Sequence, residues 1–175
     1  MAARLASLVV GVVALTGACA STAPSAPESS SPTIVPMPDP ASMQQVILPA
    51  REFVILNRLQ DVIGTFGWEA CGDQNEALYA GEVHLSFLFP KGVDEDRFLA
   101  QVTKMMVSHG WMDAPAGGAE PSGAVLHTNE VRAEIAGPNS DSRERGTILL
   151  SGECRNTSDH RDNSAEIDIT EELTN

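Results

Sequence analysis

The stretch EVHLSFLFPKGVDEDRFLAQVTKMMVSHG, residues 82–110, predicts a strand followed by a helix. Its first part alternates apolar and polar side chains, which is typical of a strand half-buried in a sheet. The residues expected on the buried face of this strand are Val83, Leu85, Phe87 and Phe89. The second part begins at Asp94, a good helix cap, and ends at Gly110. The apolar face expected for this helix is formed by Phe98, Val102, Met105 and Met106.

The flanking sequence extends this unit to a single domain over residues 42–156. Upstream, residues 49–64 have helical spacing, which predicts a helix that begins at Pro49, with a turn or two before it, and ends at Gly64. A short strand is expected at residues 64–72. Downstream, residues 123–137 and 146–154 alternate, which predicts strands of an antiparallel sheet with one face in solvent. The expected fold is α+β, with two helices packed on one face of a small antiparallel sheet.

The N-terminal residues have the three-part layout of a secretory signal. Arg4 precedes an apolar run over residues 5–18, and small residues come before Cys19. The run has about 14 residues, fewer than the about 20 that a membrane-spanning helix needs. Residues 15–19, LTGAC, resemble the lipobox of bacterial lipoprotein signal peptides. This resemblance implies that residues 1–18 are removed and that Cys19 carries a diacylglycerol; a cleaved signal without lipid is the alternative.

Two further segments have compositions that disfavour a packed core. Residues 19–41 are rich in Ser, Thr, Pro and Ala, which predicts a disordered tether with a reach of up to about 65 Å. Residues 157–175 are acidic and are also expected to be disordered. An extra edge strand that contains Ile167 and Ile169 is the alternative for this tail.

The three cysteines divide into one lipid site and one pair. If Cys19 is acylated, Cys71 and Cys154 remain, and disulfides persist in exported proteins. We therefore predict a Cys71–Cys154 disulfide, with a metal or catalytic cysteine as the alternative. Strand alternation places the two side chains on different faces, so a bulge or a strand end must bring them together.

The charge and the motifs exclude several classes of function. A formal net charge of -13 repels phosphate backbones, so nucleic-acid binding is disfavoured. The four histidines lack metal-ligand spacing, and the sequence contains no GxSxG, HExxH or phosphate-binding glycine loop. We therefore expect no catalytic residue, no metal and no cofactor.

The tether, the small α+β domain, the GW and SGECR stretches and the two remaining cysteines resemble actinobacterial lipoproteins of the mycobacterial LppA/LppV-like type. This resemblance implies export and anchoring at the outer face of the cytoplasmic membrane, in the cell envelope, without implying an activity. The function expected is a non-catalytic binding or accessory module. Its partners would be the membrane, through the N-terminal lipid, and an envelope protein or glycan.

Strand alternation also predicts a binding face on the solvated side of the sheet. The residues expected there are His84, Ser86, Leu88, Glu130, Arg132, Glu134, Thr147, Leu149 and Ser151. Leucines among charged and hydroxyl groups can form an apolar centre with a polar rim. The alternatives are an envelope hydrolase, which needs titratable groups that converge in a cleft, and a carrier of a small apolar ligand, which needs an apolar cavity.

Overall fold

The structure, a computed structural model, describes residues 35–71, 78–114, 123–138, 144–163 and 165–175. The expected signal peptide (1–18), Cys19 and most of the expected tether lie outside these residues. The elements are α1 (Asp39–Asn57), β1 (Gln60–Ala70), β2 (Tyr79–Leu88), α2 (Glu95–Ser108), β3 (Met112–Ala114), β4 (Gly123–His127), β5 (Arg132–Ala136), β6 (Arg145–Ser151), β7 (Ile167–Asp168) and α3 (Thr170–Thr174).

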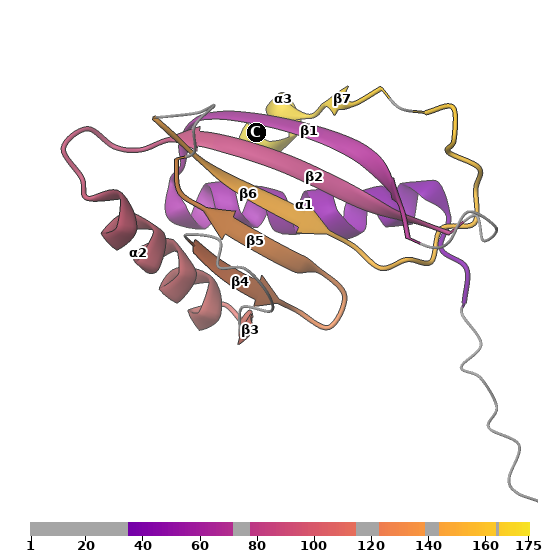
Figure 1. Cartoon of the computed structure of the whole chain (residues 1–175), viewed down its shortest axis with the longest axis horizontal. Coiled ribbons are helices and arrows are strands. Elements are labelled where there is room, and N and C mark those ends of the chain that lie inside the picture. Colours follow the sequence, from indigo (N-terminus) through magenta and orange to yellow (C-terminus); the bar gives the residue numbers. More distant parts are fainter. Residues whose placement is uncertain (1–34, 72–77, 115–122, 139–143, 164) are drawn as a thin grey trace, which may run out of the picture. The chain divides into compact units, whose positions relative to one another are not determined.

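The strands form one antiparallel sheet in the order β3-β4-β5-β6-β2-β1-β7. Helix α1 contacts β1, β2 and β6, and α2 contacts β4 and β5 (Figure 1). Residues from both helices and from the inner side of the sheet belong to one hydrophobic core. The expected α+β fold, with helices packed on one face of an antiparallel sheet, is therefore confirmed. Within the described residues no helix covers the opposite face, which is called the open face below.

The strand and helix predicted from residues 82–110 are both present. Val83, Leu85 and Phe87 are buried on the inner face of β2. The backbone N–H of Arg97 donates to Asp94 Oδ1 over 2.9 Å, so the predicted cap of α2 forms. Gly110 follows the helix with a φ of +98°, a conformation that favours glycine. The inner face of α2 differs slightly from the expectation, because Leu99 is buried with Val102 and Met106.

Helix α1 does not begin at Pro49, which lies inside it. The helix starts at Asp39, within the segment expected to be tether. A proline inside a helix removes one hydrogen bond and costs about 3 kcal/mol. Buried side chains on both sides of the proline, Val46 and Ile47 before it and Phe53 after it, offset this cost by packing against the sheet.

The predicted end of α1 at Gly64 is also wrong. The helix ends at Asn57, and Arg58 adopts a left-handed conformation with φ 50° and ψ 45°. Strand β1 then begins at Gln60, so Val62 reaches the core from a strand and Ile63 points to the opposite face. The spacing of the apolar residues around Val62 fits both a helical and a strand period. This ambiguity explains the error.

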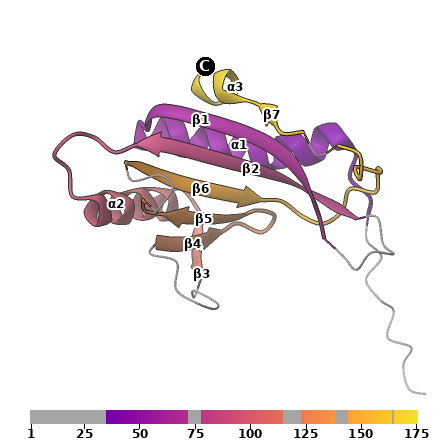
Figure 2. The same ribbon diagram turned by 45° about the horizontal axis from the view of Figure 1, so that its top comes forward.

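The C-terminal tail is ordered, contrary to the expected disorder. Strand β7 pairs with Thr65 and Phe66 of β1, which agrees with the alternative of an extra edge strand. The short helix α3 follows and contacts α1 and β1 (Figure 2). Leu173 is fully buried and packs where Gly64 has no side chain, since a Cβ there would overlap Leu173 Cδ1. The tail therefore completes the core beside β1.

The predicted disulfide joins Cys71 to Cys154, with the two Cα atoms 5.8 Å apart. Cys71 directly follows β1, and Cys154 lies three residues beyond the end of β6. Because both cysteines lie beyond their strands, alternation no longer separates them. The bond therefore links the end of β1 to the chain that follows β6, and it crosses the start of β2, which lies between these two strands.

The first residues that the structure describes, just before α1, are bound to the segment that follows β6. The N–H of Met37 donates to the carbonyl of Arg155 over 2.8 Å, and Arg155 Nε donates to the carbonyl of Val35 over 2.9 Å. Gln45 of α1 is hydrogen-bonded to Glu153 of the same segment. The start of α1 and the chain after β6 thus form one continuous junction.

Candidate functional site

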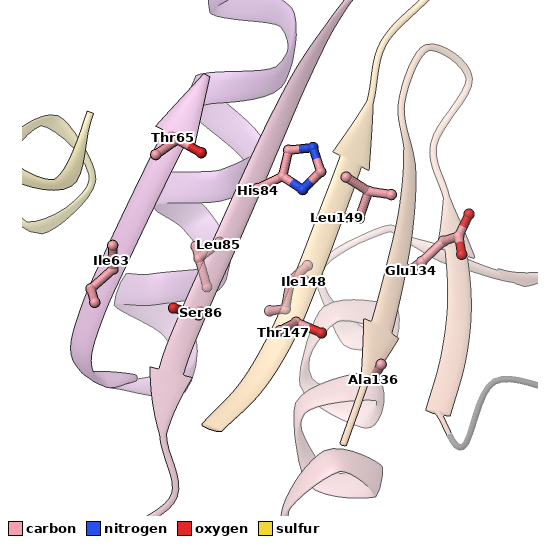
Figure 3. Close-up of a pocket in the computed structure, with 10 residues that line it drawn as sticks. All are labelled: Ile63, Thr65, His84, Leu85, Ser86, Glu134, Ala136, Thr147, Ile148 and Leu149. Carbon is pink, nitrogen blue, oxygen red and sulfur yellow. The ribbon is translucent and has the colours of Figure 1, made fainter. Parts of the chain in front are cut away.

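The open face of the sheet carries a shallow hollow with a volume of about 420 Å³ over β1, β2, β6 and β5. The strand registers align two rows of side chains across it, and Figure 3 shows both. One row is Thr65, His84, Leu149 and Glu134, and the other is Ile63, Ser86, Thr147 and Ala136. The hollow is therefore lined by aliphatic groups and hydroxyls, with two titratable side chains in one row.

The titratable groups of this face interact with near neighbours. His84 Nε2 lies 3.2 Å from Glu82 Oε2 on the same strand. Ser151 Oγ donates to the other oxygen of this carboxylate over 2.9 Å. On β5, Arg132 forms an ion pair with Glu134. The carboxylates of Glu82 and Glu134 thus both have partners within the face.

The arrangement of Ser86 and His84 does not match a nucleophile and its base. Arg145 Nε donates to Ser86 Oγ over 3.2 Å, while the His84 ring is directed to Glu82. An activated serine needs a base within hydrogen-bonding distance of its hydroxyl. The Arg145 side chain also donates to the backbone carbonyls of Ser86 and Asp61. These contacts make Ser86 part of a structural network at the edge of the hollow.

The structure brings together part of the binding face expected from the sequence. His84, Ser86, Glu134, Thr147 and Leu149 line the hollow. The other expected residues, Leu88, Glu130, Arg132 and Ser151, lie outside it.

Three residues in the two rows of the hollow, Ile63, Thr65 and Ala136, are absent from the face expected from the sequence. Ile63 and Thr65 belong to β1, and Ile63 falls in the part of β1 that the sequence pattern assigns to a helix. The alternation of Val62, Gly64 and Phe66 with Ile63 and Thr65 was the signal that could have placed them on this face.

A second polar cluster lies on the helix-bearing side, at the start of α1. The Asp39 carboxylate accepts hydrogen bonds from Asn156 Nδ2 over 2.8 Å and from Ser158 Oγ over 2.6 Å. These hydrogen bonds, that of Asn156 first, lower the pKa of Asp39 below its usual value of 3.8. His160 Nε2 lies 3.5 Å from the same carboxylate, and its ring stacks on Trp68 at a centroid distance of 3.9 Å. This cluster joins the tail to the start of α1.

Over the described ranges, no group of three or more His, Cys, Asp or Glu side chains could hold a metal ion. Within the same part of the chain, no helix combines the length and the apolar character needed to cross a membrane.

Comparisons with known proteins show the family to which the chain belongs. A family model described as "Putative lipoprotein LppJ" matches residues 38–172. The protein of that name from Mycobacterium tuberculosis, strains CDC 1551 / Oshkosh and H37Rv, is 36% identical over 175 residues, which cover 97% of this chain and 91% of the relative. The Mycobacterium bovis protein is 35% identical over the same shares. No solved structure matches the chain. The expected likeness to mycobacterial lipoproteins is confirmed, and the chain belongs to the LppJ family.

Proposed function

We propose that this chain is an exported lipoprotein, anchored to the outer face of the cytoplasmic membrane by a lipid on Cys19, and that its open sheet face binds a partner protein without catalysis. The anchoring is supported by the apolar run before Cys19 and by the name of the relatives, which are described as lipoproteins. A diacylglyceryl group supplies two acyl chains, and two chains hold a protein firmly where one holds it weakly.

The hollow on the open face is the observation that carries the binding role. Ile63 is 51% exposed at one side of it, and Leu149 lies between His84 and Glu134. Interfaces commonly have an apolar centre and a polar rim, with charges paired or at the edge. The hollow has this layout. Its aliphatic and hydroxyl-bearing side chains are suited to contact with the surface of another protein. The hydrogen bonds of Ser86 and His84 support binding over hydrolysis.

A photo-crosslinking residue at position 65, on the β1 side of the hollow, tests this role. In intact cells it should capture one protein, and Ile63→Asp or Leu149→Asp should abolish the crosslink. Leu48→Asp is the matched control, because Leu48 is 58% exposed on α1, away from the sheet face. Thermal melts and an intact disulfide show that each variant is folded.

Three outcomes would contradict the binding role. The first is an unchanged crosslink in both aspartate variants, and the second is an equal loss of the crosslink in the Leu48→Asp control. The third is capture of a polysaccharide in place of a protein. Loss of membrane association in Cys19→Ala tests the anchor independently.

A further inference from the structure

We propose that the groove between α2 and the β3–β4 edge of the sheet is a second binding site, whose ligand is an amphiphile with one aliphatic chain and a cationic head group. The groove has a volume of about 560 Å³. Ligand sites commonly have volumes of about 300 to 1,000 Å³ and a mostly apolar lining. This groove lies on the helix side of the sheet edge and shares no residue with the hollow on the open face.

Small and aliphatic side chains give the groove its apolar floor. Leu99 and Ala100 contribute from α2, and Ala124 contributes from β4. Val107, 43% exposed, lies at the C-terminal end of the helix and extends the apolar lining. Gly123 also lines the groove, and a Cβ there would overlap the carbonyl oxygen of Ile135. The close approach of β4 to β5 therefore requires glycine at this position, which has no side chain to add to the lining.

The charged side chains that line the groove favour a cationic head group on the ligand. Asp96 at the start of α2 and Asp113 on β3 line the groove, and both are exposed. Neither carboxylate forms an ion pair in the described part of the chain. Among the described residues of the lining, Lys104 is the single cation. Two carboxylates against one ammonium, in a chain of net charge -13, favour a cation over an anion.

The test compares two probes of equal chain length and opposite charge, dodecylammonium and dodecanoate, below their micellar concentrations. Calorimetric titration uses the full chain with Cys19→Ser, so that no attached lipid competes. We expect one equivalent of dodecylammonium to bind, and dodecanoate to bind at least about tenfold more weakly. Asp113→Asn should weaken dodecylammonium about threefold, the effect of one exposed ion pair.

Filling the groove separates specific binding from general attraction to an acidic protein. Ala100→Trp places a large ring in the groove and should weaken dodecylammonium at least about tenfold. Ala41→Trp, at an exposed alanine of α1, is the matched control and should leave the affinity unchanged. Equal affinity for the two probes would overturn the choice of head group. Unchanged affinity in Ala100→Trp, absence of binding, or preference for a basic amphipathic peptide would overturn the site.

Discussion

The packing of the C-terminal helix on β1 makes a quantitative prediction about Gly64 and Leu173. Leu173 is fully buried, so Leu173→Ala removes a side chain from the core. Such truncations cost about 2 to 5 kcal/mol, and we expect the lower end because a chain end can relax. In Gly64→Ala the new Cβ overlaps Leu173 Cδ1 and comes within 3.5 Å of Ile169 Cγ1. Overpacking of this kind costs about 1 to 3 kcal/mol.

The double variant shows whether these two costs arise from one contact. With the leucine truncated, the Gly64→Ala methyl has room, so the combined loss should be smaller than the sum by at least about 1 kcal/mol. Urea unfolding followed by tryptophan fluorescence, with the disulfide kept oxidised, measures the free energy of unfolding of each protein. Gly67→Ala on the same strand is the control, because a Cβ there meets nothing within 4 Å. Additive losses, or an equal loss in Gly67→Ala, would refute the packing described for α3.

Three other changes have clear expected outcomes. Cys71→Ser with Cys154→Ser should lower the free energy of unfolding by about 4 kcal/mol, because the bond closes a long loop, and denaturation of the oxidised wild type and of the variant measures this difference. Asp39 has a lowered pKa in the fold, so its contribution is present above about pH 4 and is lost as the pH falls below that value; the melting temperatures of the wild type and Asp39→Asn should therefore converge in acid, and parallel curves would exclude this. A clickable fatty acid should label the wild type but not Cys19→Ala, and equal labelling would disprove lipid attachment at this cysteine.

The parts of the fold that sequence predicted correctly are those where local signals and burial agree. In β2 the alternation of Val83, Leu85 and Phe87 coincides with the inner face of the sheet. In α2 the Asp94 cap and Gly110 mark the ends of the helix. The disulfide followed from the number of cysteines and the expected export, although its geometry depends on strand ends that sequence did not locate.

The errors occurred where tertiary packing overrides local preference. Pro49 is a strong local signal for a helix start, yet the buried face of α1 continues through it. The acidic tail contains few apolar residues, and Ile169 and Leu173 become buried because β1 offers them a surface. The absence of Ile63 from the predicted site has a different reason, because apolar residues at this spacing fit a helical period as well as a strand period.

The junction at Arg155 determines where mechanical load enters the domain. A pull on the chain from its N-terminal side must first break the hydrogen bonds that join Val35 and Met37 to Arg155. Arg155 directly follows Cys154, and the disulfide continues from there to Cys71 at the end of β1. While these hydrogen bonds hold, part of the force passes from Arg155 through Cys154 and the disulfide to the end of β1, and α1 bears the full load only after they break.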